Sequence, residues 1–169
     1  MVTKMRHLDL FSGIGGFAIA TEMVWGRENV EHTFCEINPY CQALLKRRFP
    51  NAKIYGDIRG LTADTYWDRS QEPRSEQQAG WNRPDDKVDL LTGGFPCQPF
   101  SAAGKRRGTE DNRFLWPEML RCIREFQPTW VIAENVRGLL TIEQGVVFEQ
   151  VCLDLEGAGY EVQPFIIPA

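Results

Sequence analysis

The stretch from Arg6 to Trp25, RHLDLFSGIGGFAIATEMVW, decides the fold. An apolar run over residues 6–11 stops at the turn Ser12-Gly-Ile-Gly-Gly16, after which residues 17–25 carry apolar side chains at helical spacing. The expected order is therefore strand, glycine turn, helix. Glycine has no Cβ, so such a turn allows a ligand to approach the backbone closely. A plain strand-to-helix turn without a ligand is an equally common use of these glycines.

Strand-like runs recur downstream, and most of them are followed by a stretch with helical spacing. The further strands are expected at residues 31–36, 52–55, 88–92, 130–133 and 160–167. The further helices are expected at residues 39–48, 114–126 and 143–155, with Gly157 or Gly159 as the cap of the last one. Residues 62–86 are polar and predict a solvated insertion, and residues 93–112 predict a long loop. This alternation predicts an α/β fold with a doubly wound, mainly parallel sheet.

The composition limits the classes of protein to consider. The chain has 169 residues, of which 43% are hydrophobic and 25% charged, which suits one domain over residues 1–169 but not two. No apolar run is long enough for a signal peptide or a membrane span, so we expect a cytoplasmic protein without a membrane partner. The net charge of −4 disfavours a protein that coats nucleic acid by charge alone. Five cysteines without a C-x-x-C pair and only two histidines predict neither disulfides nor a metal site.

Two acidic residues follow expected strands, at the edge where a doubly wound sheet binds its ligands. Glu36 lies about 20 residues past the glycine turn, where a carboxylate can accept hydrogen bonds from both ribose hydroxyls. Asp57 follows the third strand and can accept a hydrogen bond from an adenine amino group. The alternatives are a surface glutamate and a helix-capping aspartate. Because the glycine spacing departs from G-x-G-x-x-G, we expect an adenosine ligand without a phosphate chain.

The loop Phe95-Pro-Cys-Gln-Pro-Phe-Ser101 contains the candidate nucleophile, Cys97. Polar Gln98 and Ser101 flank this thiol, and the basic run Lys105, Arg106, Arg107 follows it, which are surroundings that favour a thiolate. A free cysteine without such a context is more often an inert small hydrophobe. The basic run is ordinarily part of a solvated loop, but here it can contact phosphates while the glycine-rich loop closes over a substrate.

Glu134 and Asn135 follow the neighbouring strand. We therefore expect the carboxyl group of Glu134 near the Cys97 loop, where it would pair a nucleophile with an acid. The alternative role of Glu134 is that of an ion-pair partner for a basic side chain, such as Arg137 or Arg113.

In order and in spacing, these motifs resemble those of the DNA (cytosine-5) methyltransferases. The matching segments are Phe11-Ser-Gly-Ile-Gly-Gly-Phe17, Glu36, Gly56-Asp-Ile58, Gly94-Phe-Pro-Cys-Gln-Pro-Phe-Ser101 and Glu134-Asn-Val136. The resemblance covers essentially the whole chain. It implies the Rossmann-like fold of the S-adenosylmethionine-dependent methyltransferases, S-adenosylmethionine as the cofactor and DNA as a partner.

The resemblance also implies roles for individual residues. Phe11 would stack on the adenine, and Glu36 would hold the ribose. Ile37 stands where family members often carry a tryptophan, so stacking on the second face of the adenine would be weaker here. The other implied cofactor contacts are Gly13, Gly15, Gly16, Asp57, Ile58, Gly94, Pro96 and Leu115. The implied DNA contacts are Gln98, Ser101, Lys105, Arg106 and Arg107.

The implied reaction explains why a cysteine and an acid are needed. C5 of cytosine is a poor nucleophile, so Cys97 would add to C6 and make C5 enamine-like. Glu134 would hydrogen-bond to N3 and stabilise the negative charge that develops in the ring. Methyl transfer to C5 and loss of the C5 proton would then expel Cys97. Neither face of C6 is accessible within a duplex, so the base has to be flipped out first.

Enzymes of this family continue with an arginine-bearing motif, a target-recognition region and a final segment that completes the cofactor pocket. None of these is present before Ala169, so we expect the front, catalytic part of a longer or split enzyme, ending before the last strand of its sheet. A second chain would then supply the missing motifs, or the exposed sheet edge would lead to self-association.

Three other functions remain open. The first is a non-catalytic remnant that binds S-adenosylmethionine or dimerises, which the joint presence of Cys97 and Glu134 disfavours. The second is an NAD-linked oxidoreductase with a catalytic cysteine, which the glycine spacing disfavours. The third is methylation of RNA in place of DNA.

Overall fold

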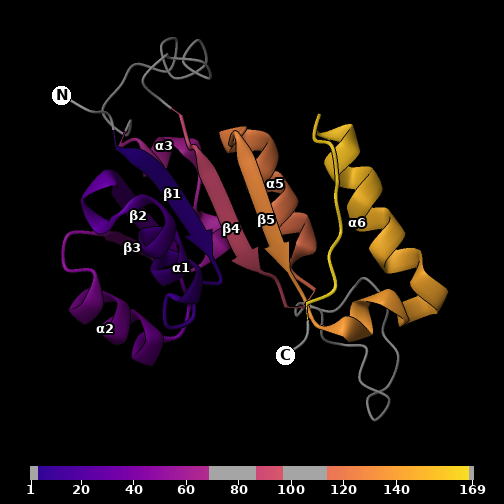
Figure 1. Cartoon of the computed structure of the whole chain (residues 1–169), viewed down its shortest axis with the longest axis horizontal. Helices are drawn as coiled ribbons and strands as arrows, with labels where there is room; N and C mark the ends of the chain where they lie inside the picture. Colours follow the sequence, from indigo (N-terminus) through magenta and orange to yellow (C-terminus); the bar gives the residue numbers. More distant parts are fainter. Residues whose placement is uncertain (1–3, 69–86, 97–113, 168–169) are drawn as a thin grey trace.

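Five parallel strands form the centre of the molecule (Figure 1). The computed structural model describes residues 4–68, 87–96 and 114–167. In these ranges the strands are β1 (Met5–Leu10), β2 (Val30–Cys35), β3 (Lys53–Tyr55), β4 (Leu90–Gly94) and β5 (Trp130–Glu134). Their order in the sheet is β3-β2-β1-β4-β5, and every neighbouring pair is parallel. The strand order reverses between β1 and β4, which confirms the predicted doubly wound sheet.

Helices cover both faces of this sheet. They are α1 (Gly16–Trp25), α2 (Pro39–Arg48), α3 (Ala63–Tyr66), α5 (Trp116–Phe126) and α6 (Val146–Gly157), with the 3₁₀ turns η1 (Arg27–Asn29), η2 (Ile58–Gly60), η3 (Arg137–Leu140) and η4 (Ile142–Gly145). Ala18 of α1 and Leu45 of α2 form a buried cluster with Phe34 of β2 on one face. The start of α2 matches the prediction because the Asn38 side chain accepts hydrogen bonds from two N–H groups of its first turn. In the described ranges, the helices are too short or too polar to cross a membrane.

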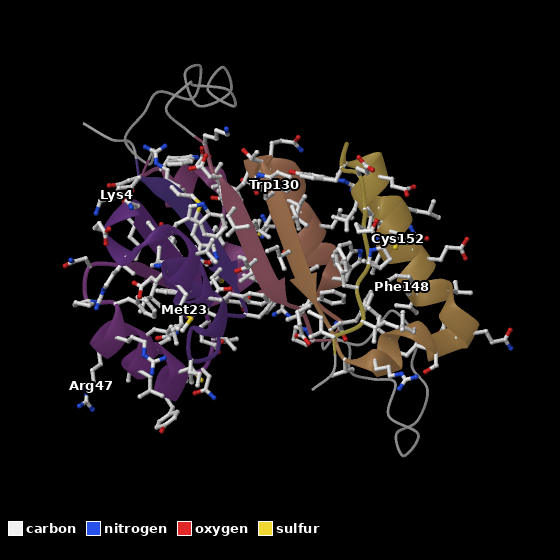
Figure 2. All side chains as sticks on the ribbon, viewed as in Figure 1. Lys4, Met23, Arg47, Trp130, Phe148 and Cys152 are labelled. Atoms are coloured by element: carbon white, nitrogen blue, oxygen red, sulfur yellow. The ribbon has the colours of Figure 1, made fainter. Side chains whose placement is uncertain are left out.

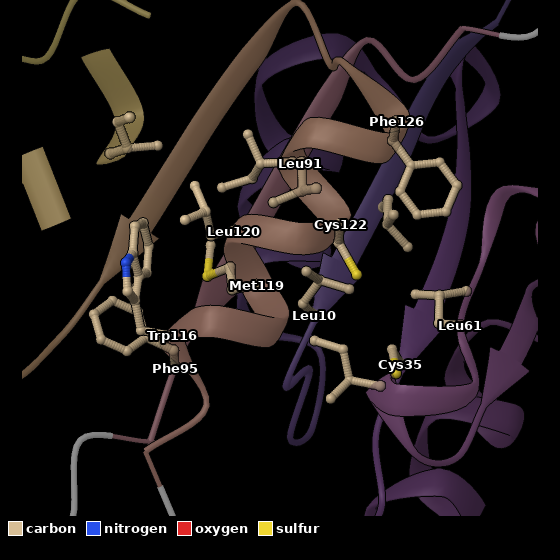
Figure 3. Packing of buried hydrophobic residues seen from close by; sticks show 14 of the residues in the cluster. Leu10, Cys35, Leu61, Leu91, Phe95, Trp116, Met119, Leu120, Cys122 and Phe126 are labelled. Atoms are coloured by element: carbon tan, nitrogen blue, oxygen red, sulfur yellow. The ribbon is translucent and has the colours of Figure 1, made fainter. Parts of the chain in front are cut away.

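The opposite face of the sheet packs against α5, which carries much of the core (Figure 3). Side chains alternate along a strand, so Leu8 and Leu10 both point toward α5. The residues of α5 that are buried there are Trp116, Met119, Leu120, Cys122, Ile123 and Phe126. The indole N–H of Trp116 also donates a hydrogen bond to Asp154 of α6 at 2.7 Å. This contact fixes α6 against the outer side of α5.

One face of β5 is uncovered in the described part of the chain. Trp130 and Ile132 lie on the α1 side of the sheet, opposite Leu90 and Thr92 in the register, yet they are 70% and 48% exposed. Figure 2 shows Trp130 at the amino end of β5. β5 is also an edge strand. Within the described residues, the α1 side of β5 is therefore open.

The prediction of a strand over residues 160–167 was wrong. No strand is formed there, and Phe165, Ile166 and Ile167 are mostly exposed. The segment is tied at its start, where the hydroxyl of Tyr160 donates a hydrogen bond to the carbonyl of Pro128 at 2.7 Å. Its apolar residues are typical of a strand, but Pro164 in the middle has no N–H to donate to a ladder.

The polar stretch that was predicted as a solvated insertion begins with the short helix α3. Thr62 starts this helix with a reciprocal capping box, and Tyr66 is buried against Phe126 with 5.2 Å between the ring centroids. The prediction was therefore wrong for residues 62–68, where Ala63, Tyr66 and Trp67 pack on the core. The remainder, residues 69–86, lies outside the described residues.

Helix α6 begins three residues later than predicted and ends on a glycine, as predicted. Glu143 and Gln144 have φ angles of 47° and 61°, which interrupt the helical spacing that the sequence shows there. Of the two candidate capping glycines, Gly159 has the left-handed conformation, with a φ of 94°. The N–H of Tyr160 then donates to the carbonyl of Leu155 at 3.1 Å and closes the cap.

Candidate active site

The parallel strands bring the predicted site residues to one edge of the sheet. The register places Leu10 beside Cys35 and Gly94 beside Glu134, so the carboxyl ends of the strands lie together. The predicted residues within two positions of these strand ends are Phe11, Glu36, Ile37, Asp57, Gly94, Pro96 and Glu134. This is the edge at which doubly wound sheets bind their ligands.

The glycine turn after β1 has one open position and one packed position. Gly13 and Gly15 both have left-handed φ angles, of 53° and 85°. A Cβ at Gly13 would meet nothing within 4 Å, whereas a Cβ at Gly15 would approach Leu45 and Phe49 to 3.0 Å. Gly13 therefore leaves room for a ligand, while Gly15 is needed to pack the turn against α2. A Cβ on Gly16, the first residue of α1, would also meet open space.

Glu36 is a buried anchor of the turn, and the alternative of a surface glutamate does not hold. Its side chain accepts hydrogen bonds from the N–H groups of Gly13 at 2.8 Å and Asn38 at 2.7 Å. The side-chain amide of Gln42 donates to its carbonyl oxygen at 2.6 Å. With only 9% of its surface exposed, Glu36 holds both carboxylate oxygens in fixed positions beside the turn.

The residues predicted to contact adenine differ in their surroundings. Asp57 caps η2 by accepting a hydrogen bond from the N–H of Arg59 at 3.0 Å, so the capping role weighed in the sequence is present. Ile58 is buried in the main core, which leaves its backbone rather than its side chain for a ligand. Ile37 is 70% exposed and offers an apolar surface at the same edge.

The ends of β4 and β5 are fitted to each other. A Cβ on Gly94 would lie 2.9 Å from Oε2 of Glu134, so a larger residue would displace this carboxyl group. The side-chain amide of Asn135 donates a hydrogen bond to the carbonyl of Phe95 at 2.8 Å. No ion pair joins Glu134 to Arg137, although the structure describes both residues.

The loop that holds the predicted nucleophile lies outside the described residues, but its two ends are close together. The predictions in this loop concern Cys97, Gln98, Ser101, Lys105, Arg106, Arg107 and Arg113. The N–H of Leu115 donates a hydrogen bond to the carbonyl of Pro96 at 3.3 Å. The chain therefore leaves and rejoins the described structure at one point, directly after Gly94 and beside the end of β5.

Two other cysteines are poor nucleophiles. Cys35 and Cys122 are buried in the core, and this burial raises the pKa of each thiol to about 12. Each thiol therefore stays protonated at neutral pH, and a thiol attacks an electrophile far more slowly than a thiolate.

A buried polar chain on the α1 face of the sheet was not predicted from the sequence. His7 contacts Thr92 at 2.8 Å through Nε2 and His32 at 2.9 Å through Nδ1, and the hydroxyl of Thr92 donates to Asp9 at 2.6 Å. The signal was present, because His7 and Asp9 alternate along β1 and therefore share a face. A sequence prediction that treats histidines only as metal ligands misses this hydrogen-bonded chain.

The comparison with known proteins identifies the family. The sequence profile of the C-5 cytosine-specific DNA methylase family matches residues 5–169. The chain belongs to this family. Its relatives include the Type II methyltransferase M.PspPI of Psychrobacter sp. (strain TA137), which is 36% identical over 92% of this chain and 33% of its own length. The Type II methyltransferase M.BspRI of Lysinibacillus sphaericus is 41% identical over 98% of this chain and 41% of its own length.

Solved structures support the same fold. S. pombe Dnmt2 methyltransferase superposes with a TM-score of 0.58 and 23% identity, over 89% of this chain and 42% of that chain. A mutant of Spodoptera frugiperda DNMT2 gives a TM-score of 0.58 at 22% identity, over 89% of this chain and 41% of that chain. This C5 methylase domain therefore has the Rossmann-like methyltransferase fold, and it spans well under half the length of the relatives named here.

Proposed function

We propose that residues 1–169 form one S-adenosylmethionine-binding and catalytic domain of a DNA (cytosine-5) methyltransferase, completed by further residues of the protein or by a second chain. The observation that carries this proposal is the strand register that places Glu134 beside Gly94, just before the chain enters the Cys97 loop. An acid from β5 and a nucleophile three residues after Gly94 would meet at one edge of the sheet.

The residues at this edge suit an adenosine bound without a phosphate chain. Gly13 leaves open space above the turn, and the carboxylate of Glu36 is fixed where it would accept hydrogen bonds from ribose hydroxyls. Phe11 and the exposed Ile37 would contact the two faces of the adenine. The other residues of the proposed pocket are Gly15, Gly16, Asp57, Ile58, Gly94, Pro96 and Leu115. When bound, S-adenosylmethionine supplies an electrophilic methyl group on a sulfonium.

The protein's own residues would make cytosine reactive. The thiolate of Cys97 forms a bond to C6, and the electron pair of the C5–C6 double bond becomes available at C5. Glu134 donates a hydrogen bond to N3 and stabilises the negative charge that this addition places in the ring. After C5 has accepted the methyl group, it loses its proton, the double bond reforms, and Cys97 leaves as a thiolate.

DNA binding would rest on the loop between Pro96 and Phe114. Lys105, Arg106 and Arg107 would contact phosphates, while Gln98 and Ser101 would contact the flipped cytosine and its neighbours. The net charge of the chain is −4, so this contact has to be local. A second chain would supply the missing motifs, or the open edge at β5 would lead to self-association.

The test is covalent trapping on DNA that contains 5-fluorocytosine, with S-adenosylmethionine present and intact mass as the readout. Fluorine at C5 blocks the final elimination, so a competent Cys97 stays attached to the DNA. We expect an adduct that is absent in Cys97→Ser and that forms more slowly in Glu134→Gln. An adduct in Cys97→Ser would overturn the assignment of the nucleophile. Cofactor binding without any adduct would show that the remaining part of the enzyme is required for attack on the base.

A further inference from the structure

The buried chain His32, His7, Thr92, Asp9 has two unsatisfied ends. Among the described residues, the buried side-chain atoms without a hydrogen-bond partner are Oδ2 of Asp9 and Nε2 of His32. These are the two terminal atoms of one chain of contacts that crosses β2, β1 and β4. Each of these two atoms can accept a proton, so the chain can hold one proton more than this arrangement contains.

When Asp9 is ionised, counting hydrogens fixes the direction of every bond in this chain. The hydroxyl of Thr92 has one hydrogen and donates it to Asp9, so its oxygen accepts from Nε2–H of His7. A neutral His7 then has an unprotonated Nδ1, which accepts a hydrogen bond from Nδ1–H of His32 at 2.9 Å. Nε2 of His32 is therefore unprotonated as well, and it lies 3.7 Å from the carboxylate of Glu22. In this arrangement Asp9 is ionised.

We propose that His32, His7, Thr92 and Asp9 form a buried proton-sharing relay with two arrangements, and that the relay couples the charge of Asp9 to the binding of a cationic ligand at the glycine turn. The second arrangement contains one more proton, taken from solvent. Asp9 then donates to Thr92, Thr92 to Nε2 of His7, and Nδ1–H of His7 to Nδ1 of His32. Nε2–H of His32 then faces the carboxylate of Glu22 at 3.7 Å, so one added proton reverses every bond in the chain.

The charges around the relay favour uptake of this proton near neutral pH. Burial, together with the nearby carboxylate of Glu36, raises the pKa of Asp9 to about 7. Burial lowers the pKa of His7 to about 3, and burial and the nearby Arg27 lower that of His32 to about 4. Both rings therefore stay neutral while Asp9 titrates, as both arrangements require. Glu22 faces the His32 end, and Glu36 faces the Asp9 end.

The coupling between the relay and ligand binding rests on the proposed function, in which S-adenosylmethionine binds at the carboxyl edge of the sheet. Asp9 lies two residues before Phe11, its backbone carbonyl accepts a hydrogen bond from the hydroxyl of Ser12 at 2.6 Å, and its neighbour Glu36 holds Gly13. S-adenosylmethionine carries a positive sulfonium, which favours the ionised form of a nearby buried carboxyl group. Binding would therefore expel the relay proton, and by linkage a rise in pH through 7 would strengthen binding.

The relay itself is tested without any ligand, by ¹⁵N NMR of the imidazole rings. The chain has only two histidines, so both rings can be assigned. Above about pH 8 we expect Nε2–H on His7 and Nδ1–H on His32, and below about pH 6 the opposite tautomer on both rings, with one shared midpoint. Rings that keep one tautomer across this range, or that change at separate midpoints, would overturn the relay.

Two variants separate the relay from general packing. Thr92→Val keeps the shape of the residue but removes the hydroxyl, and Asp9→Asn removes the titrating group; either change should abolish the shared tautomer switch. Thr141→Val, at an exposed threonine, should leave the switch intact. If Thr92→Val does not fold, Asp9→Asn still decides the question. A switch that persists in a folded Asp9→Asn protein would contradict the proposal.

The coupling is tested by titration calorimetry in buffers with different ionisation enthalpies near pH 7. S-adenosylmethionine should release a substantial fraction of a proton, and S-adenosylhomocysteine, which lacks the sulfonium charge, should release clearly less. Asp9→Asn should abolish the difference. Equal proton release by both ligands, or none, would overturn the coupling and leave the proposed function standing. No binding of either ligand would overturn the proposed function and the coupling together, whereas the tautomer switch would still establish the relay.

Discussion

The two faces of β1 differ in chemistry, because one is apolar and the other is polar and hydrogen-bonded. Leu8 and Leu10 point toward α5 and are fully buried among apolar side chains. His7 and Asp9 point toward α1, are equally buried, and belong to a hydrogen-bonded polar chain. Over residues 7–10 this strand therefore carries an apolar face and a polar face, and neither is exposed to water.

This difference separates stability from function within a single sheet. Apolar burial stabilises the fold by about 25 cal/mol per Å² removed from water. Buried polar groups contribute little net stability, because desolvation offsets most of each hydrogen bond, but they fix geometry and charge. The polar face continues into the edge with Glu36 and Glu134, so we expect changes on the α5 side to affect folding and changes on the polar side and edge to affect ligands.

The largest expected effect is on the apolar side, from Trp116→Ala. This indole is 2% exposed, packs on Phe95 and donates a hydrogen bond to Asp154, so its loss leaves a large cavity. We expect the free energy of unfolding to fall by about 3–5 kcal/mol in urea titration. Trp130→Ala is the matched control, because this residue is 70% exposed and should change stability by at most about 0.5 kcal/mol. Similar losses in both variants would contradict the contrast between the faces.

The next effect is at the edge, from Gly94→Ala. The added Cβ would lie 2.9 Å from Oε2 of Glu134 and would push the proposed acid out of place. We expect the rate of adduct formation with 5-fluorocytosine DNA to fall roughly 10²-fold, the usual cost of misplacing a catalytic group by about 1 Å. Gly60→Ala is the control, because its Cβ would meet nothing within 4 Å. An unchanged rate in Gly94→Ala would mean that the position of Glu134 does not matter.

A smaller effect is expected from Glu36→Gln. The glutamine has to place an N–H donor where the carboxylate accepts from Gly13 or Asn38, so the fixed geometry beside the turn is lost. We expect S-adenosylmethionine affinity to fall about tenfold, equivalent to about 1.4 kcal/mol, in equilibrium binding. Glu149→Gln, at an exposed glutamate of α6, should bind normally. Normal binding by Glu36→Gln would remove the ribose-contact role from this residue.

The sequence predicts most of this fold, because the informative signals are local. The glycine turn, the start of a helix at Pro39 and the apolar spacing of α5 each follow from neighbouring residues, and all three are confirmed. The prediction of a strand over residues 160–167 gave too little weight to a local signal, because Pro164 has no N–H to donate to a neighbouring strand. The helix α3 was missed because its stability comes from Tyr66 packing on Phe126, far away in the sequence.

The site follows the same rule. Glu36 and Glu134 could be placed at one edge from the sequence, because the carboxyl ends of parallel strands share an edge of the sheet. The fit of Gly94 to Glu134 could not be predicted, because it depends on the register between β4 and β5. The polar chain needed three strands in register before His32, His7, Thr92 and Asp9 could meet, and each of these residues is unremarkable by itself.

The smallest expected effect is on the acid stability of the polar face. The folded pKa of His7 is lowered from 6.5 to about 3 and that of His32 to about 4, so each ring contributes stability that is present above pH 6.5 and is lost as pH falls. Asp9 acts in the opposite direction, because its folded pKa is raised from 3.8 to about 7 and its contribution is lost as pH rises through 7.

His7→Phe removes one of the two histidine contributions to the pH dependence of stability. The variant therefore separates the effect of the histidines from the opposite effect of Asp9. We expect the loss of stability between about pH 7.5 and about pH 5.5 to be smaller in the variant by roughly 1 kcal/mol, measured by urea unfolding at each pH. Thr92→Val is the control, because it breaks the chain but keeps both buried rings, and it should retain more of the acid sensitivity. If His7→Phe and Thr92→Val showed the same pH dependence as the unmodified protein, the rings would not be titrating between the folded and unfolded states. The polar face would then be a packing feature like its apolar counterpart, and the contrast between the two sides of β1 would disappear.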